Sequence, residues 1–265
     1  MLSLAALLMA MPGQTAAPCP APVMAFAPPL STPMILRRRI ERALTDGVFV
    51  YEATYRLTFV RAGSGYRMHW QQIDERSEGP GELLRLLELQ ERSASGESFD
   101  VTLDKGGAVL GISESPGSAE RLAQAIDRLR NDPAVTARPA QQRAQLAAML
   151  DRLATLPTEE RIALHRARLE RPVMLAGRPC SSGQVIAADG TAYRIAGESG
   201  DSLHLVAARA LARETGGSLS VSDDLTLSRA NGMVQQFNRR TVTTVAGTSR
   251  NSRESVSLER APNDP

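Results

Sequence analysis

The sequence predicts an α+β fold, in which two antiparallel β-meanders form a strongly curved sheet or partial barrel with a central three-helix segment. Strand-like runs separated by short turn signals occupy both ends of the chain, and helical patterns occupy its middle. The chain contains five Phe, four Tyr and one Trp, and six of these ten aromatic residues fall on one face of the first meander. A one-residue slip would move every side chain to the other face, so one consistent face supports the assignment.

The first hairpin has the turn signal Asp46-Gly47 between strands expected at about 34–44 and 48–60. We expect Thr45 to pair with Val48, and this register fixes the pairs that share one face. These pairs are Leu44 with Phe49, Arg42 with Tyr51, Ile40 with Ala53, Arg38 with Tyr55, Leu36 with Leu57, and Met34 with Phe59.

A third strand is expected at about 65–76, after a four-residue loop from Arg61 to Ser64. This loop extends the same face by three further pairs, because side chains of a strand alternate between its two sides. The pairs are Phe59 with Tyr66, Leu57 with Met68, and Tyr55 with Trp70.

This aromatic face has two interpretations. A hydrophobic core covered by the helices is the ordinary structure for such a face. The alternative is an apolar cavity, whose ligand-facing residues would be Arg38, Arg42, Tyr51, Tyr55 and Trp70. In that case the two arginines lie at cation–π distance from the two tyrosines and engage an anionic head group.

After a break at 77–81, the leucine spacing over 82–92 predicts a short helix. Phe99, Val101 and Leu103 then alternate toward a hairpin turn at 104–107.

Three helices are expected in the middle of the chain. The first runs from a cap at Ser118 to about Arg130, and the second spans 141–156. The third begins at a cap on Thr158 and ends before Pro172.

Strands return with a small hairpin at 184–196 and a second meander. The strands of that meander are expected at about 202–213, 218–229, 233–245 and 250–260. Asp223 shares a face with the leucines of its strand, so an inward carboxylate needs a partner. The sequence predicts a cross-strand ion pair with Arg239 or Arg240.

The expected organisation is a single folded domain behind an export signal. Its parts are a signal peptide at 1–17, an extended, poorly ordered Pro/Ala-rich leader at 18–33, an α+β domain at 34–260 and a disordered tail at 261–265. The domain divides into a first β region at 34–116, a helical segment at 117–171 and a second β region at 182–260. The apolar run of the signal is too short to span a bilayer, and no later segment comes close, so no transmembrane segment is expected in the mature chain.

Cys19 and Cys180 are the two cysteines. In an exported protein an even pair is a disulfide candidate, and two free thiols are the alternative.

The formal net charge is +2, and Lys105 is the only lysine among 31 basic residues. The arginines alternate with acidic residues instead of forming a basic stripe, which argues against a nucleic-acid partner.

Catalytic and metal-binding patterns are weak. His69, His165 and His204 have no second ligand at metal-binding spacing, so no metal or other cofactor is expected. Residues 200–203 spell Gly-Asp-Ser-Leu, the block of one family of serine esterases. Ser202 would be its nucleophile, but the only nearby base is His204 on the same strand face. We interpret this block as a turn before a strand, and we expect no enzyme activity.

The order of these segments resembles the carriers that shuttle lipoproteins across the periplasm. The meander at 34–76 and the helices over 118–170 carry that likeness, which implies an unclosed barrel holding a lipid under helices. The stretches Leu225-Thr226-Leu227, Asn231-Gly232-Met233-Val234 and Arg239-Arg240-Thr241 resemble the endings of uncharacterised exported proteins of Gram-negative proteobacteria, which implies a periplasmic location.

These observations favour a non-enzymatic exported β-rich protein that binds a lipid or other amphiphile, or an envelope protein. A structural or interaction protein without a pocket is the alternative, and an envelope serine hydrolase is a second one.

Overall fold

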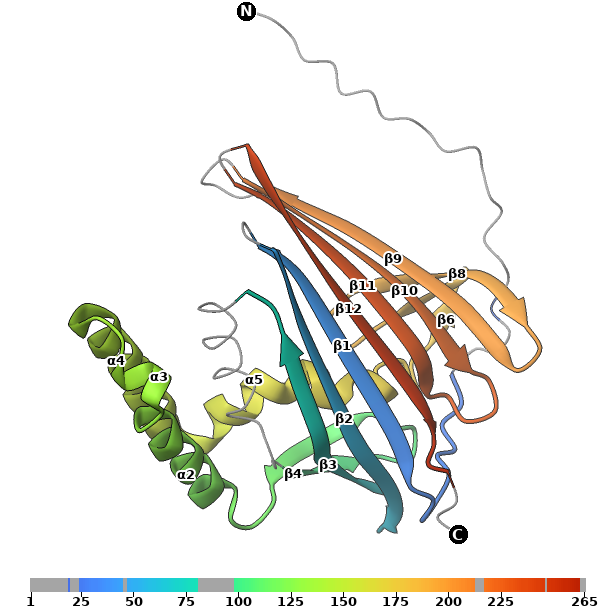
Figure 1. Ribbon diagram of the computed structural model, residues 1–265. Helices are drawn as coiled ribbons and strands as arrows, with labels where there is room; N and C mark the ends of the chain where they lie inside the picture. The colour runs from blue at the N-terminus through green and yellow to red at the C-terminus, as the bar shows by residue number, and fades with distance from the viewer. Residues whose placement is uncertain are drawn as a thin grey trace, which may run out of the picture.

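The computed structural model describes Cys19 and residues 24–44, 47–80, 98–212, 217–245 and 247–262. The expected signal peptide, the helix expected at 82–92 and residues 263–265 of the expected tail lie outside these ranges. Within them the dominant element is one twelve-stranded antiparallel sheet, and it is open and not closed into a barrel (Figure 1). More of the described residues lie in strands than in helices, so the fold is mostly β and fits the expected α+β class only loosely.

The strands follow the order β5-β4-β3-β2-β1-β12-β11-β10-β9-β8-β7-β6 across the sheet. The first and last long strands are therefore neighbours, and their pairing joins the two meanders into one sheet. The strands are β1 (Met34–Leu44), β2 (Gly47–Ala62), β3 (Gly65–Glu78), β4 (Ser98–Leu103), β5 (Val109–Glu114), β6 (Cys180–Ser181), β7 (Gln184–Ile186), β8 (Ala192–Ser199), β9 (Ser202–Ala212), β10 (Ser218–Ser228), β11 (Val234–Val245) and β12 (Thr248–Arg260).

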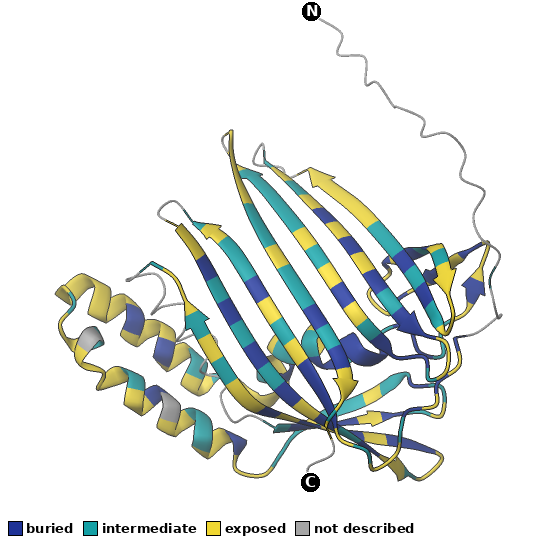
Figure 2. Cartoon of the chain, turned by 45° about the vertical axis from the view of Figure 1, so that its right-hand side comes forward, coloured by how far each residue is buried: buried dark blue, intermediate teal, exposed yellow. Residues whose placement is uncertain are grey.

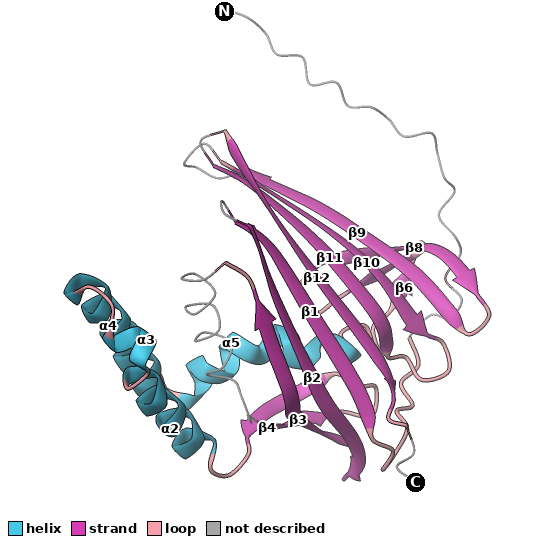
Figure 3. Ribbon diagram, viewed as in Figure 1, coloured by secondary structure: helices cyan, strands magenta, loops and turns pink. Residues whose placement is uncertain are grey.

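In chain order the described helices come between the two β regions, as expected, and Figure 3 shows them in cyan beside the single sheet. They are α2 (Ser118–Arg130), α3 (Pro133–Thr136), α4 (Ala140–Thr155), α5 (Thr158–Glu170) and the 3₁₀ helix η1 (Arg171–Val173).

The expected register of the first meander is wrong by two residues at each turn. Leu44 pairs with Gly47, so Leu36 lies opposite Tyr55 and not opposite Leu57. Ala62 pairs with Gly65, which closes the second hairpin with two residues instead of four. Gly63 has a φ of 59°, the left-handed conformation that such a tight hairpin turn requires.

The faces of the first meander are nevertheless as predicted, because a two-residue shift preserves the alternation of side chains. All six aromatic residues of the predicted face belong to the hydrophobic core: Phe49, Tyr51, Tyr55, Phe59, Tyr66 and Trp70. Figure 2 shows buried positions alternating with less buried ones along these strands. We call this side of the sheet the inner face and the opposite side the outer face.

Helix α5 (Figure 1) and η1 cover part of the inner face. Leu169 and Val173 are buried in the same core as the strand residues. The Arg168 guanidinium lies 5.3 Å from the centre of the Tyr55 ring, and His165 lies 5.4 Å from the Phe99 ring. Apolar burial of this kind is the main stabilising contribution to such a fold.

Helices α2 and α4 form a hairpin that projects from the sheet (Figure 1). It has a small core of its own, in which Ile126, Leu146 and Leu150 are buried. The expected caps at Ser118 and Thr158 are wrong, because these residues are the first of their helices and the cap positions are Gly117 and Pro157. Each hydroxyl instead accepts a hydrogen bond from an arginine three residues later, at 3.0 Å in both cases.

The segment before β1 is packed from Met24 onward, which corrects the expectation of a poorly ordered leader. Met24 and Phe26 are buried in the main core. The Met24 amide donates to the Arg178 carbonyl at 3.0 Å, and the Gly177 amide donates to the Met24 carbonyl at 2.9 Å. A Cβ at Gly232 would lie 1.7 Å from the Ala25 carbonyl oxygen, so this close approach requires glycine.

Cys19 and Cys180 form a disulfide between residues 161 positions apart, with Cα atoms 5.8 Å apart. It attaches the N-terminal segment to β6 at one edge of the sheet. Among the described residues no helix is long and apolar enough to cross a membrane.

We expect Cys19→Ser/Cys180→Ser to lower the free energy of unfolding by about 2–5 kcal/mol, because the bond restricts a long loop of the unfolded chain. Urea denaturation with and without a reductant measures the loss. The reductant should destabilise the natural protein and leave the double variant unchanged. A double variant with the same urea midpoint as the natural, unreduced protein would contradict a stabilising role for the bond.

Candidate functional site

The three aromatic residues expected to face a ligand are part of the closed core. Tyr51, Tyr55 and Trp70 are 1%, 0% and 1% exposed. The Tyr55 and Trp70 rings lie on the same side of the sheet, with centroids 4.9 Å apart. The structure thus places these residues as a core and not as the walls of an accessible cavity.

The two arginines of the expected ligand-facing set do not lie opposite the tyrosines. Arg38 is paired with Ala53 and Arg42 with Phe49, as the two-residue register shift requires. The cation beside Tyr55 comes from Arg168 on α5 instead. No strand pattern could have indicated this contact, since it depends on how the helix packs on the sheet.

Asp223 forms the predicted cross-strand ion pair, and its partner is Arg239. The Asp223 carboxylate accepts hydrogen bonds from Arg239 Nε and Nη2, both at 2.7 Å. The Tyr193 hydroxyl donates to the same carboxylate at 2.8 Å. Three acceptor contacts satisfy this buried group, as a charge in an apolar surface requires.

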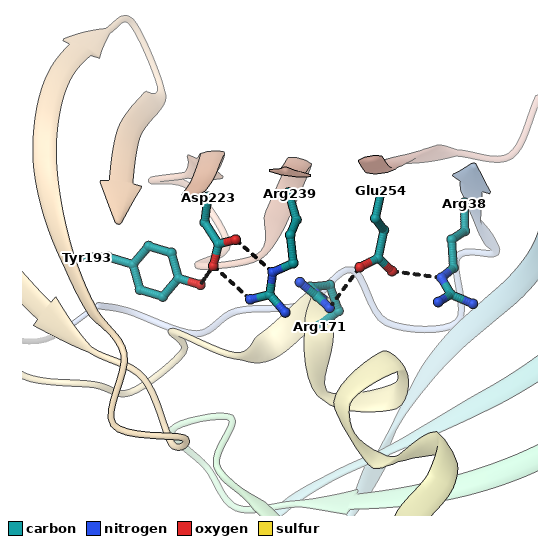
Figure 4. Close-up of polar contacts among 6 residues, drawn as sticks. All are labelled: Arg38, Arg171, Tyr193, Asp223, Arg239 and Glu254. Atoms are coloured by element: carbon teal, nitrogen blue, oxygen red, sulfur yellow. Dashed lines mark hydrogen bonds and ion pairs between the residues drawn. The ribbon is translucent and has the colours of Figure 1, made fainter. Parts of the chain in front are cut away.

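Glu254 continues this polar arrangement on the neighbouring strand. It lies opposite Arg239 in the register and accepts from Arg38 Nε at 2.8 Å and from Arg171 Nη2 at 3.5 Å. The Arg171 guanidinium lies 3.7 Å from the centre of the Phe237 ring. We call the set Arg38, Arg171, Tyr193, Asp223, Arg239 and Glu254 the polar row (Figure 4).

The polar row perturbs the pKa values of its members. Burial alone would raise the pKa of Glu254, but Arg38 and Arg171 outweigh it and hold the pKa below the ordinary value of 4.5. Burial, together with the Asp223 carboxylate, raises the pKa of the Tyr193 hydroxyl. Burial lowers the pKa of Arg171, although an arginine remains charged in proteins. The row therefore holds paired charges and a neutral tyrosine.

The sequence pattern predicted Asp223 with Arg239 or Arg240 as its partner, and it singled out Arg38 only as a ligand-facing residue. It did not indicate Arg171, Tyr193 or Glu254. Glu254 shares an inward face with Val256 and Leu258, just as Asp223 shares a face with the leucines of its strand. The same pattern of an inward carboxylate could therefore have indicated it. Arg171 follows a helix and precedes a proline, and nothing in that pattern indicates that it is buried.

The histidines and Ser202 do not assemble into a catalytic site. Ser202 Oγ donates to Gln235 Oε1 at 3.3 Å, whereas His204 Nε2 lies 3.0 Å from Asp224 Oδ2. His69 lies 3.0 Å from Asp100 on the outer face, and His165 is half-buried on α5. Among the described residues no three His, Cys, Asp or Glu side chains are grouped in a way that could hold a metal ion.

Comparisons with known proteins identify no relative. No family model matches the chain, and no curated protein matches it. A solved structure entitled "Lipid-protein interactions in lipovitellin" is similar at a TM-score of 0.39 and 6% sequence identity, over 88% of this chain and 26% of that one. The chain thus spans about a quarter of the length of that protein, and the similarity is too low to carry an argument.

We expect Glu254→Gln to lower the free energy of unfolding by about 3 kcal/mol, because it leaves Arg38 and Arg171 buried without their charged partner. Since the pKa of Glu254 is held below 4.5, its contribution is complete above that pH and is lost as the pH falls through the folded-state value. The variant should therefore also show a weaker acid dependence of stability.

Chemical denaturation between about pH 7 and pH 3 measures both effects. Glu259→Gln is the matched control, because Glu259 forms an exposed ion pair with Arg37, and such pairs contribute about 0–1 kcal/mol. Equal losses of unfolding free energy in Glu254→Gln and Glu259→Gln would contradict a structural role for the polar row.

Proposed function

We propose that this protein is an exported, non-catalytic binding protein that holds an anionic amphiphile on the inner face of its sheet. The proposed surface is the part of the inner face beyond the polar row, toward the turns after β1, β9 and β11. We call it the upper inner face. Its residues include Arg42, Leu44, Arg209, Leu211, Leu219, Val221, Thr241, Thr243, Val245 and Arg250.

The observation that carries the proposal is that apolar side chains on the inner face are exposed beyond the polar row, at Leu211 and Val245. Leu225 and Phe237, below the polar row, are both 0% exposed. Leu211 and Val245, above it, are 54% and 51% exposed although they point to the same side. Exposed apolar side chains that share one face favour an apolar occupant.

Arg209 on this surface donates to Thr191 Oγ1 at 3.2 Å, and two further arginines give the surface an affinity for a negative head group. Arg42 lies opposite Ser252, and Arg250 is two residues further along the same strand, so the two are neighbours on one face. Among the described residues neither forms a hydrogen bond or an ion pair. Guanidinium groups beside apolar surface suit the carboxylate or phosphate of an amphiphile.

Two features support an exported and periplasmic location. The apolar N-terminal run is typical of a signal peptide, and the Cys19–Cys180 disulfide is typical of an oxidising compartment. A function without catalysis is supported by the separate partners of Ser202 and His204, since a serine nucleophile needs its base within hydrogen-bond reach.

A displacement assay tests the proposed surface. A fluorescent fatty acid should bind the purified protein and be displaced by dodecyl phosphate. We expect Leu211→Glu/Val245→Glu to weaken binding at least tenfold, because two charges replace apolar contacts. Val60→Glu/Leu110→Glu is the matched control, as these residues are 42% and 68% exposed elsewhere. Its affinity should be unchanged.

A second comparison isolates the head group. Arg42→Ser/Arg250→Ser should weaken the binding of dodecyl phosphate more than the binding of dodecyl maltoside, which has no charge. Native mass spectrometry of protein from its own envelope should show a co-purified amphiphile. No fatty-acid binding by the natural protein, or equal loss in both glutamate pairs, would rule out this surface and favour an interaction protein without a pocket.

A further inference from the structure

We propose a second site, on the outer face of the sheet, that binds a phosphate group. This face is hollowed by a groove of about 870 Å³ that crosses β8 to β12 and β1. That volume lies within the range of ordinary ligand sites. The residues that carry the proposal belong to the outer face, so the site is independent of the upper inner face.

Two arginines face each other across neighbouring strands in this groove. Arg240 on β11 lies directly opposite Arg253 on β12. Side chains in that position have Cβ atoms about 5 Å apart, and like charges there repel each other. Both residues are exposed and line the groove.

The carboxylates near these arginines are engaged elsewhere. Glu41 lies opposite Arg253, but it is paired with Arg39 at 2.8 Å. Asp224 is paired with His204 at 3.0 Å. Among the described residues, neither Arg240 nor Arg253 forms a hydrogen bond or an ion pair. The pair therefore presents ten guanidinium N–H donors, five on each arginine, to the groove.

The rest of the groove leaves this charge uncompensated. Its outward charged residues are four arginines and two carboxylates: Arg39, Arg194, Arg240, Arg253, Glu41 and Asp224. Small side chains flank the arginine pair, with Ser222 opposite Arg240 and Ser255 two residues from Arg253. An anion can therefore approach both guanidinium groups from solvent.

A neighbouring groove shows the contrasting arrangement. It measures about 510 Å³ on the same face, and Arg39 and Arg76 both line it. There Glu52 accepts from Arg76 Nε at 2.6 Å and also from Arg39, so its arginines are neutralised by the protein. Of these two grooves, the larger one holds an opposed arginine pair whose nearby carboxylates are bonded to other residues.

The chemistry favours a tetrahedral oxyanion. Planar guanidinium groups bind phosphate through paired N–H···O bonds, and two of them can hold different oxygens of one phosphate. A binding groove of about 870 Å³ exceeds the size of phosphate itself, so it leaves room for the organic part of a phosphate ester. The ester is a soluble phosphate compound or a phospholipid head group.

The test uses two probes with the full folded chain. Inorganic phosphate is titrated by calorimetry and by its effect on the melting temperature, and vesicles of phosphatidylglycerol are compared with vesicles of phosphatidylcholine. We expect Arg240→Ser/Arg253→Ser to weaken binding at least tenfold. The matched control is Arg56→Ser/Arg67→Ser, which removes the same charge from two exposed outer-face arginines outside both grooves.

Phosphate binding that only the groove variant loses supports the site with a soluble source. Binding to phosphatidylglycerol vesicles alone, again lost only in the groove variant, supports it with a lipid source. No binding of either probe by the natural protein, or equal losses in the two double variants, would overturn the proposal. Both variants should melt as cooperatively as the natural protein, because the exchanged side chains are exposed, and the single variant Arg253→Gln repeats the measurement with a smaller change.

Discussion

The alternation of side chains along β1, β2 and β3 is the constraint on which the rest of the structure depends. It gathers the aromatic residues on one side and leaves charged and small residues on the other. Helix α5 and η1 can then bury the aromatic side. Most outer-face side chains of these strands are exposed or half-buried, with Ile35 as an exception, as is usual for an antiparallel sheet that packs on one face.

The polar row separates the inner face into two regions with different physical character. Below it, apolar side chains are buried under α5, η1 and the segment that begins at Met24. Above it, the same strands carry half-exposed Leu, Thr and Arg residues. Asp223 and Glu254 would be costly in such a position without partners, and the arginines of the row remove that cost. The row therefore lies near the margin of the folded core, beyond which Phe49 and Val221 are still buried and the proposed ligand surface begins.

Local pattern was enough to predict the strands and their faces. The two-residue errors in register did not change the predicted faces, because a shift by an even number of residues leaves every side chain on the same side of the sheet. The Asp223–Arg239 pair was predictable for the same reason, as both residues belong to one hairpin. The partners of Glu254 were not, since Arg38 and Arg171 come from a strand and a 3₁₀ helix distant in sequence. The proposed ligand-facing role of Tyr51, Tyr55 and Trp70 failed because no sequence pattern states how fully a helix covers a face.

Because β1 pairs with β12, the sheet can be fully assembled only after β12 has been made. Synthesis proceeds from the N-terminus, so β1 is made early and its neighbour β12 is the last of the described strands to be made. Until then β1 is an open edge that other chains could join. Its centre is Arg37-Arg38-Arg39, and these charges disfavour pairing with a wrong strand. The serines and glutamates of β12 complement them, with Glu259 and Glu254 already placed to receive two of the three. The charges that pair β1 with β12 in the complete sheet are therefore of the kind that disfavours wrong pairing at an open strand edge.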